Sequence, residues 1–392
     1  MQNRINIDYT ILSILILLGL VSIFTLYTLE PTLSASDGSG YWLKQGMWYI
    51  AGGLIIAAVM LVDYDRFHQI TWILYGIGLL SLFMLFVGFP PGIVTEVNGA
   101  VSWFQFPGMS IQPGEFIKVI LVMTLAHVIV RHNNKYIEKT FKSDVILLAK
   151  MIALSLPPMF FLIKQPDLGG FLVLVAITGS MVLVSGIRWR ILFFLFFIGF
   201  CAVGLIGAVW YFFPDYVASF LDKSGLDHVA GRFIGWLNPG ESDGGYGYQL
   251  ITAMMAIGSG QLFGKGISDL QVSVPEQHTD MIFTAIAEQF GFIGSSIVVT
   301  LLFLLIYRLI HIAIQSNDAY GSYLVTGMIG MFAYQIFQNI GMSIQLLPIT
   351  GLPLPFLSYG GSSTLTYMLA IGIVLNVHSR TKKYMFETRW KN

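Results

Sequence analysis

The chain is dominated by apolar stretches whose length matches the thickness of a bilayer. Stretches near the roughly 20 residues that a helix needs to cross the hydrocarbon core recur at ten places: 9–29, 45–63, 71–89, 114–131, 145–163, 168–186, 191–213, 282–307, 321–345 and 358–378. Only 11% of the 392 residues are charged, whereas a soluble domain carries about 25%. We therefore predict an all-α integral membrane protein of ten spans that forms a single polytopic domain over residues 1–392.

The distribution of Lys and Arg predicts the orientation of these spans. With a cytoplasmic amino terminus, the inner segments carry fourteen Lys and Arg residues and the outer segments carry five, as the positive-inside rule requires. Both termini are then cytoplasmic. The outer side contains one long loop at 214–281, where we expect interfacial helices. Its apolar run at 250–263 is either a lid that moves about Gly258 and Gly260 or a static interfacial helix.

Charge and cysteine content exclude several classes of function. The 21 basic and 21 acidic residues balance, and no long basic run is present, so nucleic-acid binding is not expected. The single cysteine, Cys201, excludes an intrachain disulfide and a Cys-rich metal site. It lies in an apolar stretch, and we expect it to be a small core residue.

Ionisable side chains within or beside a span are costly in hydrocarbon, so each is a candidate for function. Glu115 and Lys118 are three residues apart on the fourth span, which places them on one helix face where they can neutralise each other. Either the pair only tolerates burial, or Lys118 offers a cation to an anionic headgroup while Glu115 holds it in place.

A second polar cluster, VPEQHTDMIF at residues 274–283, leads into the eighth span. Asp280 is expected at the boundary between water and lipid, where it either acts chemically or only stabilises a helix N-terminus. Helical spacing places Glu288 on roughly the same face, about 12 Å deeper, where we expect it to orient neighbouring helices. His278 is expected to be a polar orienting residue and no metal site is expected, because no second His or carboxylate stands at metal-ligand spacing.

Two further outer segments combine turn-forming and polar residues. In the hairpin KQPDLGG at 164–170, Pro166 helps to make the turn and Asp167 is expected to cap the next helix. The segment PITGLPLPF at 348–356, followed by SYGGSS at 358–363, predicts broken backbone that lines a cavity or is packed within the protein. Its Gly and Ser residues either serve a site or only permit close helix packing.

Taken together, these segments resemble the SEDS family (shape, elongation, division and sporulation), and most closely its rod-shape branch. Four ordered motifs carry the similarity: QPDLG from Gln165, GYGYQLITAMMAIGSGQLFGKG at 245–266, PEQHTDMIFTAIAEQFGFIG at 275–294 and PITGLPLPFLSYGGSS at 348–363. NGAVSWF from Asn98 and QPGEFIK from Gln112 also fit, so the resemblance covers essentially the whole chain.

The chain departs from the family pattern at three places. Val101 and Ser102 precede the Trp where the family usually has a basic residue, so this loop is not expected to bind phosphate. QPGE stands in place of the commoner QPSE, and Met281 replaces the usual Phe after the aspartate.

The resemblance implies a peptidoglycan glycosyltransferase that polymerises lipid II into glycan strands at the outer face of the bacterial cytoplasmic membrane. It implies a role in cell elongation and rod-shape maintenance, beside a class B penicillin-binding transpeptidase and other membrane proteins of the elongation complex. The family's catalytic aspartate falls on Asp280. The residues expected to bind substrate are Glu115, Lys118, Glu276, His278, Thr279, Asp167, Ser358, Tyr359 and Ser362, and those expected to shape the site are Glu288, Pro166, Gly360 and Gly361.

The chemistry of this reaction agrees with the residues. Joining a sugar 4-hydroxyl to an anomeric carbon that bears an α-linked pyrophosphate, with a β product, is an inverting displacement. It needs one base, expected to be Asp280, and undecaprenyl pyrophosphate leaves without a proton donor if a cation stabilises its charge. That cation is expected to be Lys118 or a divalent ion, Mg²⁺ or Mn²⁺; no covalently bound cofactor is expected. The lipid tail predicts a groove between helices, with apolar walls below polar residues.

Two other functions fit parts of the sequence. A flippase of the same lipid-linked precursor would use Glu288 and Glu115 as proton-coupled or headgroup-binding sites. However, the candidate residues gather at the outer boundary, whereas carriers place their sites near the midplane. A non-catalytic scaffold for the transpeptidase would leave Asp280 unexplained.

Overall fold

The computed structural model describes residues 7–32, 40–94, 101–213, 217, 227–240, 245–267 and 269–381. Within these residues, each predicted span coincides with a helix: α1 (Tyr9–Leu29), α2 (Tyr41–Leu61), α3 (Tyr64–Val87), α4 (Pro113–Lys135), α5 (Phe141–Lys164), α6 (Leu168–Val184), α7 (Trp189–Phe212), α11 (Ile282–Gln315), α12 (Ala319–Ser343) and α13 (Gly361–Thr381). Of the described helices, seven are long and apolar enough to cross a membrane, and α6 is apolar but shorter. The chain is a multi-pass helical membrane protein.

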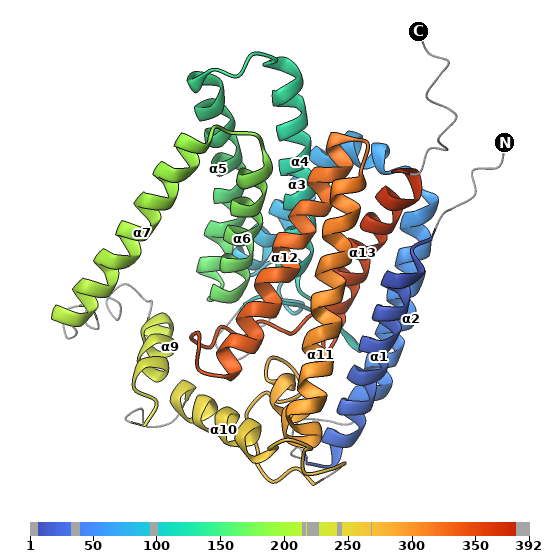
Figure 1. Ribbon diagram of the computed structural model, residues 1–392, viewed down its shortest axis with the longest axis vertical. Coiled ribbons are helices and arrows are strands. Elements are labelled where there is room, and N and C mark those ends of the chain that lie inside the picture. The colour runs from blue at the N-terminus through green and yellow to red at the C-terminus, as the bar shows by residue number, and fades with distance from the viewer. Residues whose placement is uncertain are drawn as a thin grey trace.

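The helices surround α4, which packs against α3, α5, α6, α12 and α13. This helix is the most enclosed of the candidate spans, with 78% of its most apolar window buried. The start of α1 and the end of α13 lie at the same end of the bundle (Figure 1), as an even number of spans requires. The inward orientation of that end stays a prediction, and the basic tail residues from Lys382 onward lie outside the described residues.

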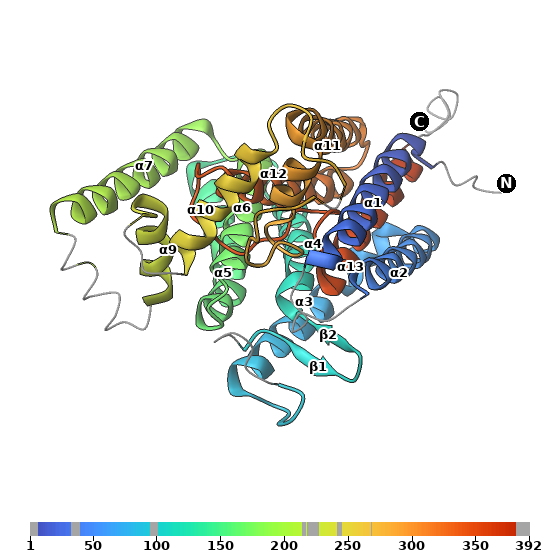
Figure 2. The ribbon, with the colours of Figure 1, turned by 90° about the horizontal axis from the view of Figure 1, so that it is seen from below.

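The described part of the long loop at 214–281 contains two short helices at the opposite end of the bundle. Helices α9 (Asp227–Leu237) and α10 (Tyr246–Ser259) pack against each other, and α10 packs against α11 (Figures 1 and 2). A two-stranded hairpin, β1 (Phe104–Phe106) and β2 (Met109–Ile111), projects from the same end (Figure 2). Its strands pair in antiparallel register, with Phe104 opposite Ile111.

Helix α7 leans away from the other helices (Figure 1). Only 12% of its most apolar window is buried, and Cys201 is exposed. The expectation that Cys201 is a core residue was therefore wrong. An apolar stretch in a membrane protein does not distinguish a residue that faces lipid from one that faces protein, since both surroundings favour the same side chains.

Helix α11 is interrupted near its start. Gly291 has a φ of +63° and a ψ of −159°, which separates residues 282–290 from the rest of the helix. The helix begins at Ile282, so Asp280 precedes it in a turn at 275–281. The expectation that Asp280 and Glu288 share one helix face was wrong, because Asp280 lies in the turn before the helix and only Glu288 lies in the helix.

The segment that follows α10 is fixed to this interruption. Phe292 N donates to Gln261 O at 2.9 Å, and Lys265 N donates to Glu288 O at 2.9 Å. A Cβ on Gly260 would collide with the backbone carbonyl of Ala287. Gly260 therefore permits close packing, and the alternative of a static segment describes 250–263 better than a lid that moves about this glycine.

We expect Gly291→Ala to destabilise the protein strongly. The alanine would have to adopt a positive φ, and its Cβ would lie 2.7 Å from the carbonyl carbon of Leu262, so the loss should be about 2 kcal/mol or more. Thermal unfolding in detergent measures it. Gly258→Ala is the matched control, because nothing lies within 4 Å of its Cβ position. An equally stable Gly291→Ala protein would contradict this account of the interruption.

Candidate active site

The turn before α11 presents Asp280. Backbone N–H groups of Thr279 and Met281 donate to Glu276 O at 3.2 and 3.1 Å, which closes the turn. Glu276 has a φ of +54°, a conformation that non-glycine residues seldom adopt. The Thr279 hydroxyl lies 2.9 Å from Glu276 Oε2 and 3.3 Å from Asp280 Oδ1. Glu276, Thr279 and Asp280, all predicted site residues, are thus brought together.

A single amide joins this turn to the segment that follows α12. Asn339 Nδ2 donates to Asp280 O at 2.6 Å and to Leu352 O at 2.7 Å. Tyr359 N donates to His278 O at 3.0 Å, which forms a second connection. The rings of His278 and Tyr359 both lie beside Tyr41, with centroids 4.6 and 4.8 Å away. The second and fourth polar clusters of the sequence therefore form one unit.

The irregular segment at 348–360 is packed within the protein. Leu354, Phe356, Leu357 and Ser358 are all buried. Side chains from other helices satisfy its carbonyls, as buried backbone requires. Ser22 Oγ donates to Leu357 O at 2.7 Å, Gln45 Nε2 donates to Ser358 O at 3.2 Å, and Gln338 Nε2 donates to Pro348 O at 2.9 Å.

The hairpin between α5 and α6, which contains Pro166, meets the same segment. Asp167 caps α6 as predicted, and its Oδ1 accepts from Gly170 N at 2.7 Å. A Cβ on Gly169 would lie 2.9 Å from Thr350 O, so only glycine permits this approach. Asp167 is therefore held beside the site by its backbone, with its carboxylate engaged in capping.

Glu115 and Lys118 form the predicted ion pair on α4. Lys118 Nζ lies 2.6 Å from Glu115 Oε1, and the side chains are 0% and 6% exposed. The other carboxylate oxygen, Glu115 Oε2, is buried and has no hydrogen-bond partner among the described residues. The pair lies in the first turns of α4. This end of α4 is near the hairpin between α5 and α6, since a Cβ on Gly114 would be 3.6 Å from Asp167 Oδ2.

Ser362, Ser358, Gly361 and Gly360, the remaining predicted residues near α13, make packing contacts. Ser362 Oγ accepts from Gln112 N at 3.0 Å and donates to Ser110 O at 3.2 Å, which ties α13 to the start of α4. Ser358 Oγ accepts from Leu354 N at 2.8 Å. Gly361 lies against Trp48, whose ring would be 2.7 Å from an added Cβ, and a Cβ on Gly360 would collide with Ser363.

Glu288 contacts the segment after α10. Its Oε1 lies 2.7 Å from Lys265 Nζ and accepts from the backbone N–H groups of Gln271 and Val272 at 3.0 and 3.2 Å. One buried carboxylate thus organises the loop that leads into the turn of Asp280. This arrangement matches a structural role for Glu288.

Asp280 is the acid with unusual electrostatics. Asp280 is only 8% exposed, and among the described residues no cation forms an ion pair with its carboxylate. Burial, followed by repulsion from Glu276, raises the pKa of Asp280 to about 7, while Thr279 and Arg232 act in the opposite direction. A carboxylate with a pKa near 7 is a suitable general base at neutral pH.

Sequence reasoning missed two residues of this site. Asn339 is an uncharged polar residue in an apolar helix. Its residue type was the available signal, because polar side chains in membrane helices commonly hydrogen-bond to neighbouring segments. Arg232 was counted only for orientation, although its Nη1 donates to Thr350 O at 3.0 Å. No sequence signal indicates that α9 brings this arginine close to a loop more than a hundred residues away.

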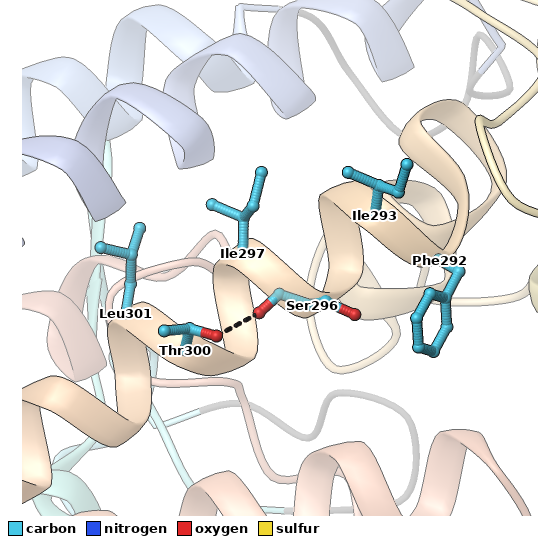
Figure 3. Close-up of a pocket in the computed structure, with 6 residues that line it drawn as sticks. All are labelled: Phe292, Ile293, Ser296, Ile297, Thr300 and Leu301. Atoms are coloured by element: carbon cyan, nitrogen blue, oxygen red, sulfur yellow. Dashed lines mark hydrogen bonds between the residues drawn. The ribbon is translucent and has the colours of Figure 1, made fainter.

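The structure also has an apolar groove of about 340 Å³ on α11. Its lining residues are Phe292, Ile293, Ser296, Ile297, Thr300 and Leu301, and Ile293, Ile297 and Leu301 point to one side of the helix (Figure 3). Asp280 is not among them, so the groove does not have the predicted order of polar residues directly above apolar walls. Among the described residues, no group of three or more His, Cys, Asp or Glu side chains could hold a metal ion.

Comparison with known proteins places these features in a family. The family model described as "Cell cycle protein", which covers FtsW, RodA and SpoVE, matches residues 6–383. The chain belongs to this SEDS family. The motifs that carry the resemblance are joined by contacts around the turn of Asp280.

Relatives of this SEDS chain come from all three branches. It is 30% identical to the probable peptidoglycan glycosyltransferase FtsW of Geobacter metallireducens, over 93% of this chain and 92% of that protein. It is 32% identical to the stage V sporulation protein E of Bacillus subtilis, over 95% of each, and 30% identical to the peptidoglycan glycosyltransferase RodA of Treponema pallidum, over 95% and 98%. These values do not separate a division role from an elongation role.

Solved structures share the fold. A chain from a study of how a peptidoglycan synthase complex coordinates polymerization and crosslinking is 26% identical, with a TM-score of 0.76 over 96% of this chain and 99% of that one. The rod-shape-determining protein RodA of Thermus thermophilus is 25% identical, with a TM-score of 0.68 over 97% and 100%.

We expect Asp280→Asn to make the protein more stable at alkaline pH. The pKa of Asp280 is about 7 in the folded chain and 3.8 is its ordinary value, so the folded state binds a proton between these pH values that the unfolded state has released. Stability of the wild type therefore falls as pH rises through this window, and the neutral amide avoids the fall. Thermal unfolding at pH 8 and pH 4 should show an advantage for Asp280→Asn that shrinks at the lower pH.

The exposed Asp269 provides the control. Asp269→Asn should behave as wild type at both pH values. An Asp280→Asn variant with no advantage at pH 8 would contradict the raised pKa.

Proposed function

We propose that this chain is a peptidoglycan glycosyltransferase that polymerises lipid II, with Asp280 as the general base. The observation that supports it most is the buried carboxylate of Asp280, which has a raised pKa and no ion-pair partner among the described residues, in contrast to Glu115 and Glu288. Glu115 and Glu288, the other two buried acids near the site, are each paired with a lysine. Asp280 is held in place through its backbone carbonyl by Asn339, which leaves the carboxylate available for a proton.

In the proposed reaction, the 4-hydroxyl of the acceptor sugar attacks the anomeric carbon of the donor. Asp280 accepts the hydroxyl proton as the new carbon–oxygen bond forms. The bond from the anomeric carbon to the pyrophosphate breaks, and its electron pair leaves with undecaprenyl pyrophosphate, so the anomeric configuration inverts. The leaving group needs no proton if positive charge stabilises it.

Several expected contacts stay predictions. We propose that Glu276, His278, Thr279 and Tyr359 contact the sugars, because they share the turn of Asp280 or touch it. Contact of Lys118 with pyrophosphate would require its buried pair with Glu115 to open towards the substrate. Among the described residues there is no group of three or more His, Cys, Asp or Glu side chains that could hold a metal ion, and we assign no step to Mg²⁺ or Mn²⁺.

We further propose an elongation role beside a class B penicillin-binding transpeptidase. The QPDLGG hairpin and the PEQHTD turn resemble the rod-shape branch, and a structural relative comes from a peptidoglycan synthase complex. We expect the turn of Asp280 to face the outside of the cytoplasmic membrane, because it lies at the end of the bundle opposite to the start of α1 and the end of α13 (Figure 1).

Asp280→Ala should abolish glycan polymerisation in a folded protein. Loss of a general base lowers a rate by roughly 10²- to 10⁴-fold. Purified protein with its transpeptidase partner, lipid II and a divalent cation would be assayed for polymer, with Asp269→Ala as the control because Asp269 is exposed in the preceding loop. If Asp280→Ala makes polymer at the wild-type rate, the proposed base is wrong. If even the wild type makes none but carries lipid II across liposomes, the flippase is the better function.

Polymerisation should also depend on the ionisation of Asp280. The wild-type rate is expected to fall as pH decreases below about 7, because the base becomes protonated. Glu276→Gln removes the charge that helps to raise the pKa of Asp280, so the acid limb of the pH–rate profile should move to lower pH. A limb that stays in place, or moves to higher pH, would contradict the assignment of that limb to Asp280.

A further inference from the structure

Helix α9 is anchored at the end of the bundle that carries Asp280. Trp236 Nε1 donates to Gln345 O at 2.9 Å, just after α12. A Cβ on Gly235 would lie 2.8 Å from Gly247 N, so the backbones of α9 and α10 approach closely at this point. These contacts fix the position of a helix that has few others.

The anchored helix holds Arg232 at the segment that adjoins Asp280. Arg232 Nη1 donates to Thr350 O at 3.0 Å, and the guanidinium lies 5.3 Å from the centroid of the Tyr246 ring. The next residue, Gly351, approaches the catalytic candidate, because a Cβ there would be 3.8 Å from Asp280 Oδ2. Arg232 and Asp280 thus lie close to consecutive residues of the same segment, Thr350 and Gly351.

The hydrogen-bonding capacity of Arg232 is only partly used. A guanidinium has five N–H donors and stays charged at every physiological pH. Arg232 Nε is buried and has no hydrogen-bond partner within the part of the chain that the structure describes. Hydrogen bonding to a further acceptor is therefore available to this side chain, and a buried donor of this kind is costly unless it acquires one.

Two buried or partly buried lysines near the site are already neutralised, whereas Lys44 and Lys164 are exposed. Lys118 is fully buried with Glu115 at 2.6 Å, and Lys265 is paired with Glu288 at 2.7 Å. Among the described residues, no carboxylate forms an ion pair with Arg232. Arg232 thus combines a buried, unused donor with a position close to the proposed base.

We infer that Arg232 binds the diphosphate of the lipid-linked donor and stabilises its charge as the glycosidic bond forms. The inference rests on the proposed function and adds a residue that contacts the leaving group. Arg binds phosphate oxygens through two parallel N–H groups, which a lysine cannot do. Negative charge on the diphosphate grows as the bond to the anomeric carbon breaks, so a cation fixed beforehand by α9 favours the transition state.

The test measures binding of diphosphate separately from binding of the lipid tail. Full-length protein in phosphatidylcholine nanodiscs would be titrated with undecaprenyl pyrophosphate and, in parallel, with undecaprenol. Arg232→Gln is expected to weaken undecaprenyl pyrophosphate binding by roughly 10- to 100-fold, as loss of a charged hydrogen bond does, and to leave undecaprenol binding unchanged. Arg232→Lys should recover part of the loss. Lys164→Gln, which removes an exposed charge from the same end, is the control.

Three results would overturn the inference. Unchanged undecaprenyl pyrophosphate binding by a folded Arg232→Gln protein would show that the arginine does not contact the diphosphate. Equal loss of both ligands would show a structural role only. Competition by added phosphatidylglycerol as strong as that by undecaprenyl pyrophosphate would show a general site for lipid phosphate.

These outcomes are independent of the proposed base. If Asp280→Asn polymerises lipid II normally while Arg232→Gln loses diphosphate binding, the proposed mechanism fails and the diphosphate site stands. If Asp280→Asn is inactive while Arg232→Gln binds and polymerises as wild type, the mechanism stands and this inference fails.

Discussion

The candidate site depends on the two hydrogen bonds that the Asn339 side chain donates to Asp280 O and Leu352 O. Irregular backbone at membrane depth has no water to satisfy its carbonyls. One amide from α12 serves both the turn before α11 and the segment after α12, so neither segment can move without the other. The backbone position of Asp280 is therefore set by a helix on which Asp280 does not lie, and its carboxylate lies beside the Thr279 hydroxyl.

The three buried acids near the site differ in whether a cation neutralises them. Glu115 and Glu288 are each paired with a lysine at 2.6 and 2.7 Å, and Glu288 also accepts two backbone N–H groups. Breaking such a buried pair by removing one partner costs about 3–5 kcal/mol, so these acids stabilise the surroundings of the site. Asp280 has burial without a compensating cation, which is an expensive arrangement unless a substrate or its chemistry requires it.

The sequence was sufficient to predict the helices but not the contacts between them. Apolar length located α1 to α7 and α11 to α13, and Pro, Gly and Ser indicated the broken backbone at 348–360, because both signals are local. The start of α11 at Ile282 and the outward position of Cys201 were not predictable in this way, since lipid and protein interiors select the same apolar residues. Arg232 and Asn339 reach the site through tertiary contacts with distant loops, which no spacing in the sequence records.

The interruption at Gly291 divides α11 into a short part and a long part. The part of the helix at 292–315 rises about 36 Å at roughly 1.5 Å per residue, which is enough to cross the hydrocarbon core without residues 282–290. The short part at 282–290 is fastened to the segment after α10 through Glu288 and Gln289, and the long part begins with hydrogen bonds from Phe292 and Ile293 to the same segment. If a change in bilayer thickness or a neighbouring transmembrane helix tilts the long part, the pivot is therefore this hydrogen-bonded junction, which also holds the segment that leads to the turn of Asp280.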